Sequence, residues 1–336
     1  MPAHTHDGID WVARLADLRQ ADESNAAALR AVADRLIESL PAPHPTVIDV
    51  GCGAGGMSAA LAAALVGRAA RATTGTSDLV ATPGSQPPAA IPHATASDSG
   101  VAAASGSADG ARARGTLVLV DAVPELLAAA GEVAAAAVSG SGAVTVRSAP
   151  ADIADAASFA GLPAADLVWA ANVAHHLPDQ RAAISTLTSL LAPGGVLALS
   201  EGGLSMRCLP WDVGVGEPGL QDRLIAAHGA WFHQMRTGMT GVVRMPVGWN
   251  RVLAEAGLGG VTAFSYLVDV PAPLSDAGRG AVVSWLTWMT HATADLLDPA
   301  DLAALRRLLD PADIAYVARR DDVFMLKANT VYLGWR

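Results

Sequence analysis

The sequence predicts a doubly wound α/β fold around a mostly parallel sheet of seven strands, with helices before the sheet and a helical cap after it. Two observations carry this prediction. A short apolar run ends in a glycine-rich turn that leads into a helical pattern, and strand and helix patterns then alternate along much of the remaining chain. Such alternation favours parallel strands joined by right-handed crossovers.

The first 45 residues predict a helical segment. From Asp10 to Leu40 apolar residues recur at helical spacing, which indicates one or two amphipathic helices. The next stretch, TVIDVGCGAGGMSAALAAAL, predicts a buried strand at 47–50, a glycine turn and a helix that opens near Gly55.

Residues 68–115 interrupt the alternation. They are rich in Ala, Gly, Ser, Thr and Pro, and they contain neither aromatic residues nor a regular period. Composition of this kind buries too little apolar surface to offset the entropy of ordering the chain. We therefore expect a disordered insertion, an inert surface excursion rather than a functional lid.

The core continues after the insertion and completes a predicted unit over residues 46–201. The predicted strands lie at 116–121, 143–149, 166–172 and 195–201, and the helices between them at 124–137, 153–160 and 179–191.

Residues 202–336 predict a cap together with the last strands of the sheet. The pattern is irregular from 202 to 246 and contains several tryptophans and methionines, which indicates a cap. The remaining predicted elements are a helix near 248–256, a strand at 261–270, helices at 276–297 and 299–309, and a strand at 323–335.

Composition excludes several classes of partner. The formal net charge of -10 repels a phosphate backbone, and no Lys/Arg stripe interleaved with aromatic residues counteracts it, so we expect no nucleic-acid partner. Apolar runs end well short of about 20 residues, so we expect no membrane span. Two cysteines and no secretory signal pattern predict a cytoplasmic protein.

The glycine turn predicts a ligand site at the end of the first strand. Glycines let the backbone turn tightly and leave no side chain between chain and ligand. The run GCGAGG also satisfies the dinucleotide pattern G-x-G-x-x-G, which is a weak signal alone. Asp49, however, places a carboxylate inside the strand, which suits a cationic ligand. S-adenosylmethionine carries an ammonium and a sulfonium and no phosphate.

Asp121 ends the next predicted strand, where an acid can accept hydrogen bonds from both hydroxyls of a ribose. It lies 70 residues after Gly51. Without the insertion of roughly 48 residues the spacing is about 22, close to the ~20 that the fold usually has. An N-cap of the following helix is the alternative role for Asp121.

Five segments together resemble the class I S-adenosylmethionine-dependent methyltransferases: VIDVGCGAG, LVLVDAVPELLAAA, ADI, DLVWAANVAHHLPD and LLAPGGVLALSE. The likeness covers about 47–66 and 116–201, and the insertion departs from the family's usual pattern. It implies a Rossmann-like methyltransferase fold, S-adenosyl-L-methionine as cofactor and a residue map. The cofactor-binding residues of that map are Asp49, Gly51, Cys52, Gly53, Gly55, Asp121, Ala122, Asp152, Ile153, Asn172 and Val173.

The map gives these residues different parts of the cofactor. The turn with Asp49 borders the methionine part, and Asp121 binds the ribose. Asp152 and Ile153 lie beside the adenine, although Asp152 is also placed to cap a short helix. Asn172 and Val173 line the floor beneath the sulfonium.

Three residues are candidates for chemistry. Methyl transfer is an in-line displacement, and much of its barrier falls when the acceptor is aligned and water excluded, so a base is optional. His175 and His176 follow the fourth strand, where they serve either as a base for an acceptor hydroxyl or in a structural role. Glu201 ends the fifth strand and either faces the acceptor or orients the cap.

The cap supplies the predicted acceptor contacts. Tryptophans concentrate in the C-terminal half, as an aromatic-lined pocket needs. Trp285, Trp288 and Met289 form one helical stripe that favours core packing. The predicted substrate-binding residues are Met206, Trp211, Trp231, His233 and Met235. We predict no metal, because His228 and His233 are poorly spaced and no carboxylate or cysteine cluster completes a site.

The sequence therefore predicts an S-adenosylmethionine-dependent methyltransferase acting on the oxygen or nitrogen of a small molecule, in specialised metabolism, with carbon methylation still open. A nicotinamide-dependent oxidoreductase is the first alternative, and a non-catalytic module that binds S-adenosylmethionine is the second. Asp49 and the lack of a recognisable Tyr/Lys catalytic pair count against the oxidoreductase.

Overall fold

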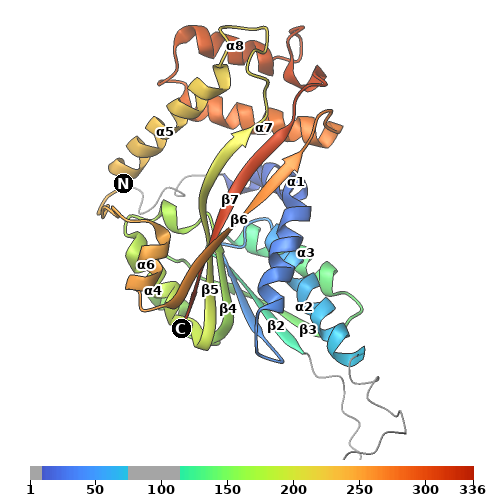
Figure 1. Cartoon of the computed structure of the whole chain (residues 1–336), viewed down its shortest axis with the longest axis vertical. Coiled ribbons are helices and arrows are strands. Elements are labelled where there is room, and N and C mark those ends of the chain that lie inside the picture. The colour runs from blue at the N-terminus through green and yellow to red at the C-terminus, as the bar shows by residue number, and fades with distance from the viewer. Residues whose placement is uncertain (1–9, 75–113) are drawn as a thin grey trace, which may run out of the picture.

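The computed structural model describes residues 10–74 and 114–336. Seven strands form one sheet in the order β3-β2-β1-β4-β5-β7-β6. Helices cover both faces of the sheet, and a second group of helices lies beyond one end of it (Figure 1). The predicted doubly wound, mostly parallel sheet is confirmed.

Five strands are parallel: β1 (Thr46–Val50), β2 (Gly115–Asp121), β3 (Val144–Pro150), β4 (Ala165–Ala171) and β5 (Leu191–Arg207). The inner strands β1, β2 and β4 are almost wholly buried runs, as expected for strands covered on both faces, whereas β3 at the edge of the sheet is partly exposed. Val50 of β1 lies opposite Val120 of β2 and Ala170 of β4. The carboxyl ends of these strands therefore meet at one edge, which is where ligands bind in open α/β sheets.

The last two strands run antiparallel. β7 (Met325–Trp335) lies between β5 and β6 (Gly259–Val270) and pairs with both. β5 continues to Arg207, so the predicted strand end at 201 is wrong. With β6 and β7 it forms a projection past the carboxyl edge, called here the ribbon (residues 202–207, 265–270 and 325–329) (Figure 1).

Two glycines explain the misplaced strand end. Gly202 and Gly203 have φ angles of 71° and 133°, and the pairing of β5 with β7 shifts register there. A side chain on Gly203 would overlap the carbonyl oxygen of Ala328. The glycines that indicated the end of a strand form a bulge inside it instead.

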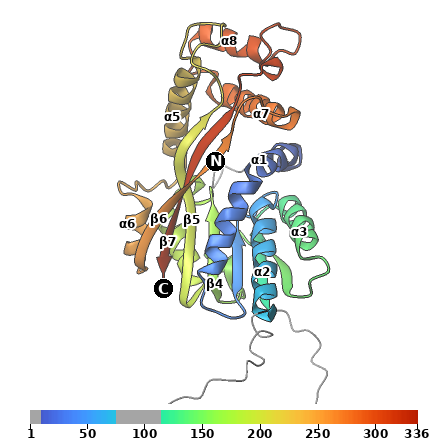
Figure 2. The ribbon, with the colours of Figure 1, turned by 45° about the vertical axis from the view of Figure 1, so that its right-hand side comes forward.

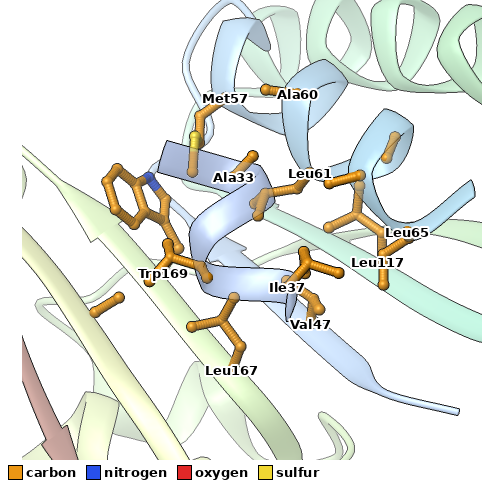
Figure 3. Close-up of a cluster of buried hydrophobic side chains, with 14 of the residues drawn as sticks. Ala33, Ile37, Val47, Met57, Ala60, Leu61, Leu65, Leu117, Leu167 and Trp169 are labelled. Atoms are coloured by element: carbon orange, nitrogen blue, oxygen red, sulfur yellow. The ribbon is translucent and has the colours of Figure 1, made fainter. Parts of the chain in front are cut away.

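Three helices cover one face of the core: α1 (Trp11–Glu38), α2 (Gly56–Thr74) and α3 (Pro124–Val138). The predicted N-terminal helical segment is thus one helix. Figure 3 shows Ile37 of α1, Leu61 of α2 and Trp169 of β4 in one hydrophobic cluster, and all three are fully buried. Burying one such side chain contributes about 1.5–3 kcal/mol. The opposite face is covered by α4 (Gln180–Ser189), α6 (Trp249–Glu255) and the short helix η1 (Ala156–Phe159).

The predicted insertion begins too early. Residues 68–74 belong to α2, and the guanidinium of Arg68 donates to the carbonyl oxygens of Leu40 and Ala42, each at 2.8 Å. This side chain ties α2 to the end of α1, which a composition argument does not reveal. Residues 75–113 of the predicted insertion lie outside the described residues.

The cap has its own core. Its helices are α5 (Leu220–Gly238), α7 (Asp276–Thr293) and α8 (Pro299–Leu309), and they lie at the far end of the ribbon (Figure 2). Leu224, Leu286 and Leu305 bring one fully buried leucine from each helix to this core. The irregular pattern predicted for 202–246 is wrong for α5. Within the described ranges, no helix is long and apolar enough to span a membrane.

Candidate active site

The glycine turn after β1 is fixed to the neighbouring strand. The backbone amides of Gly51 and Cys52 both donate to the carbonyl oxygen of Val120, at 2.8 and 3.1 Å. Gly51, Gly53 and Gly55 all have positive φ angles, of 70°, 55° and 95°. Residues other than glycine are strained at positive φ, which explains why glycine stands at each of these positions.

The three glycines have different surroundings. A side chain on Gly51 would overlap Cγ2 of Val173, and one on Gly55 would come within 2.7 Å of Cα of Ala130. Beside Gly53 no described atom lies within 4 Å of that position. The turn therefore packs closely on two sides and leaves room at Gly53, where a ligand can approach the backbone.

Asp121 closes the turn from the next strand. Its Oδ2 accepts a hydrogen bond from the amide of Gly53 at 3.0 Å, and its Oδ1 accepts one from the amide of Val123 at 2.9 Å. Burial raises the pKa of Asp121. The N-cap residue of α3 is Val123, so the N-cap alternative for Asp121 is wrong. Ala122, the residue between, is exposed.

Asp49 lies behind the turn as a buried acid. It is 1% exposed, and Ser58 at the start of α2 donates to its Oδ2 at 2.6 Å. Burial, with a smaller contribution from the nearby carboxylates of Asp121 and Asp22 and against the hydrogen bond from Ser58, raises the pKa of Asp49 to about 7. A cation bound here would favour the ionised acid, so the site suits positive charge.

Asp22 joins this group from α1, and the sequence analysis missed it. Its Oδ2 accepts a hydrogen bond at 2.9 Å from the amide of Gly56, at the N-terminus of α2. Burial raises the pKa of Asp22 to about 6. An acid in an amphipathic helix resembles a solvent-facing residue. The one available signal is that Asp22 lies seven residues before Leu29, on the stripe that faces the core.

Asp152 and Ile153 lie at the end of β3, beside Asp121. The amide of Ala151 donates to the carbonyl oxygen of Asp121 at 3.2 Å, which joins the two strand ends. Oδ1 of Asp152 accepts a hydrogen bond from the amide of Ala154 at 2.9 Å. The short helix η1 is capped by Asp155, so the capping alternative for Asp152 is wrong. Both Asp152 and Ile153 are half-buried.

The turn after β4 has an unusual backbone. Asn172 has a φ of 55°, and it is the one non-glycine residue with positive φ in the described part of the chain. Its amide donates to the carbonyl oxygen of Ser200 at 3.0 Å. Asparagine tolerates this conformation better than most residues. Asn172 is exposed, whereas Val173 lies against Gly51 and so joins this turn to the glycine turn.

Glu201 holds the same turn from β5. Its side chain is fully buried, and its Oε1 accepts hydrogen bonds from the amides of Val173 and Ala174 at 3.0 and 2.8 Å. Its Oε2 lies 2.5 Å from Nδ1 of His175. The direct acceptor contact considered for Glu201 does not agree with this burial. Glu201 orients the turn and its histidine.

His175 is the partly accessible member of this pair. Its side chain is 22% exposed, and its ring centroid lies 4.0 Å from that of His176. Because the carboxylate of Glu201 accepts at Nδ1, the neutral ring carries its hydrogen there and keeps its lone pair on Nε2. The arrangement presents a proton acceptor at the carboxyl edge of the sheet.

The cap contacts the turn of His175 through α5. Arg236 donates to the carbonyl oxygens of His175, at 2.9 Å, and of Leu177. The ring of Phe232 lies 5.8 Å from the ring of His175. Neither contact is visible in the sequence, because α5 itself was not predicted.

The predicted acceptor residues lie in different places. Trp231 stacks on His228 at 5.3 Å and meets Trp288 of α7 edge-on at 5.9 Å. Met206 is buried in the cap core, whereas Trp211 is 71% exposed. His233 is exposed and Met235 half-buried on the same helix as Trp231.

The helical stripe predicted to be core divides in two. Met289 is buried in the cap core, while Trp285 and Trp288 are partly buried against it. Residues 10–74 and 114–336 contain no group of three side chains placed to hold a metal ion.

The sheet, the glycine turn and its acids define a Rossmann-like protein that binds a nucleoside cofactor. The chain matches the model of a family described as "Methyltransferase domain" over residues 10–257, and it belongs to that family. It is an S-adenosylmethionine-dependent methyltransferase, and S-adenosyl-L-methionine is its cofactor. The family match decides against the oxidoreductase.

Solved structures show only distant likeness. The chain is similar to the YcgJ protein of Bacillus subtilis, with 14% identity over 90% of this chain and 97% of that one and a TM-score of 0.41. It is also similar to an O-methyltransferase family protein of Burkholderia thailandensis, with 20% identity over 73% of this chain and 55% of that one and a TM-score of 0.39. A third similar structure is phosphoethanolamine N-methyltransferase 2 of Haemonchus contortus, with 12% identity over 91% of this chain and 52% of that one and a TM-score of 0.38.

No curated protein matches the chain significantly. The likenesses to solved structures are too weak to bear on the acceptor, and the family assignment rests on the match over residues 10–257.

Proposed function

We propose that this methyltransferase acts on an oxygen or nitrogen of a small molecule, as a cytoplasmic enzyme of specialised metabolism, and that His175 takes the proton of the acceptor. The observation that carries the proposal is the 2.5 Å contact between Nδ1 of His175 and the buried carboxylate of Glu201. This contact fixes the tautomer and orientation of a histidine at the cofactor edge of the sheet.

The cofactor supplies an electrophilic methyl group on its sulfonium. When the acceptor oxygen or nitrogen takes the methyl group, the carbon–sulfur bond of the bound cofactor would break and its electron pair would stay on sulfur. Nε2 of His175 receives the acceptor's proton, and Glu201 stabilises the imidazolium that results. Arg236 and Phe232 hold α5 over the turn, which excludes water from it.

The residues that we propose to hold the cofactor follow from the same geometry. Asp121, next to the open space at Gly53, is placed to accept from the ribose hydroxyls. Asp49 and the glycine turn attract the methionine part, and Asp152 with Ile153 borders the adenine. Asn172 and Val173 form the floor under the sulfonium.

The test is methyl transfer from ¹³C-methyl-labelled cofactor to small molecules of an extract from the source organism. The carbon chemical shift of the labelled product distinguishes methyl groups on oxygen, nitrogen and carbon. We expect oxygen- or nitrogen-linked methyl groups. Carbon-linked methyl groups alone would contradict the proposed acceptor atom.

His175→Gln tests the base. General acid–base catalysis contributes about 10²–10⁴-fold, so we expect a loss of that size in the rate of methyl transfer. Affinity for S-adenosylhomocysteine, measured by calorimetry, should stay the same. His176→Gln is the matched control and should lose much less. If His175→Gln keeps the wild-type rate, alignment alone drives the reaction.

A further inference from the structure

Lys327 is the only lysine of the chain, and it lies on the inner face of the ribbon. Residues two apart along a strand share a face. Met325 and Val331 lie on the same face of β7 as Lys327, and both are buried, Met325 in the cap core and Val331 in the core under α1 and α2. Lys327 therefore points to the side of the sheet that the cap and α1 cover.

The strand register gives the height of Lys327 above the cofactor edge. Val331 pairs with Ser200, which in turn pairs with Ala171 at the end of β4. Lys327 lies four residues further along β7, and at about 3.4 Å per residue its Cα lies roughly 13 Å past that edge. This height is between the level of the glycine turn and that of the cap helices.

The ammonium of Lys327 has no partner among the described residues, either in a hydrogen bond or in an ion pair within 4.0 Å. The opposite charge that acts on it is Asp22, whose Oδ2 already accepts from Gly56. Burial lowers the pKa of Lys327, and Asp22 opposes that change only in part. A half-buried, unpaired ammonium becomes more stable when an anion joins it.

A second polar group, on α1, also lacks a partner. Asn25 follows Asp22 by three residues on α1, on the same helical face, and α1 packs against β6 beside β7. Its Oδ1 is buried, and no described residue donates to it. Because Oδ1 accepts hydrogen bonds, it can pair only with a donor group of a ligand, and the ammonium of Lys327 is the group here that a carboxylate needs.

We propose that Lys327 forms an anion-binding subsite on the inner face of the ribbon, which binds a carboxylate of the ligand that lies between the ribbon and α1. Two molecules can bring that carboxylate. One is the cofactor, through its amino-acid part, and the other is an acidic acceptor. The second source rests on the proposed function, whereas the first does not.

A single lysine makes a direct test available. Protein labelled with ¹³C and ¹⁵N in lysine gives one side-chain signal, and Lys327→Met confirms its origin. S-adenosylhomocysteine should shift this signal and raise the pKa of Lys327, whereas 5′-methylthioadenosine, which lacks the amino-acid part, should not. That result assigns the carboxylate to the cofactor. A shift with benzoate on protein loaded with S-adenosylhomocysteine, but not with S-adenosylhomocysteine alone, assigns it to the acceptor.

Variants give an independent readout by calorimetry. If the cofactor brings the carboxylate, Lys327→Met should bind S-adenosylhomocysteine at least tenfold more weakly, Lys327→Arg should restore most of the affinity, and affinity for 5′-methylthioadenosine should not change. If the acceptor brings it, Lys327→Met should lose benzoate binding alone. Arg207→Met removes a ribbon cation already paired with Asp222 and serves as the control. A lysine signal unmoved by all three ligands would overturn the subsite, whether or not methyl transfer is found.

Discussion

At the scale of the residue, the acids around the glycine turn couple cofactor binding to pH. Burial raises the pKa of Asp49 to about 7 and that of Asp22 to about 6, from an ordinary value of 3.8. Between the ordinary pKa of 3.8 and the raised pKa of each acid, the folded protein keeps a proton that the unfolded chain has released. The contribution of these two acids to the free energy of unfolding of the ligand-free protein therefore falls as pH rises from about 4 to about 7.

Asp49→Asn tests this coupling. The amide keeps the shape without the charge, so we expect the variant to exceed the wild type in free energy of unfolding by a few kcal/mol at pH 8, and much less at about pH 5. Urea unfolding at both pH values measures the difference. The wild type should also bind the cationic cofactor more tightly as pH rises through about 7. Equal stability differences at both pH values would contradict the assignment.

Individual residues also show how much of the site could be predicted from the sequence. The glycines were recognised because a tight turn limits the residue type at each position, and Asp121 because an acid at the end of the second strand can accept hydrogen bonds from a ribose. Asp22 and Lys327 were not, since their roles depend on which elements lie next to each other. The partner of His175 was missed for a similar reason, although Glu201 and His175 were each singled out, because only the pairing of β4 with β5 brings them together.

At the scale of the element, β5 is one strand with two parts. Its first part belongs to the core and its second to the ribbon, and the bulge at Gly202 and Gly203 joins them just after Glu201. Helices and strands with a regular period, such as β2 and α3, were predicted to within a residue or two. The ribbon part of β5 was not, because its glycines have the composition of a turn.

Substitution of the two bulge glycines should have unequal effects. The added methyl group of Gly202→Ala has no atom within 4 Å, so the free energy of unfolding should fall only by the roughly 1–2 kcal/mol that a left-handed alanine costs. Gly203→Ala would also overlap the backbone of Ala328, so we expect a loss of about 3 kcal/mol or more. Urea unfolding of both variants gives the comparison. Equal losses would mean that the bulge relaxes around the added methyl group.

At the scale of the whole molecule, the chain consists of a core that binds the cofactor and a cap with a separate hydrophobic core. The core strands were predictable because a parallel sheet imposes buried apolar runs at regular intervals. In the cap, α7 and α8 were predicted as helices at 276–297 and 299–309, whereas α5 and the ribbon part of β5 were not, because their segment has an irregular pattern rich in glycine. Three of its predicted acceptor contacts, Trp231, His233 and Met235, lie on α5.

The two cores can be tested separately. Leu286 in the cap and Leu61 in the main core are both fully buried, so alanine at either site should lower the free energy of unfolding by about 2–5 kcal/mol. Under conditions where each variant stays folded, Leu286→Ala should slow methyl transfer and keep its affinity for S-adenosylhomocysteine. Leu61→Ala should weaken that affinity. The reverse pattern would mean that the cap contributes to cofactor binding.

The guanidinium of Arg236 donates hydrogen bonds from the cap to two carbonyl oxygens, those of His175 and Leu177, in the turn after β4. A laboratory chimera that gives this enzyme the cap of another methyltransferase, in search of a new acceptor, must therefore bring a matching arginine. Without it, the transplanted cap would leave the turn of His175, the base that we propose, without this support.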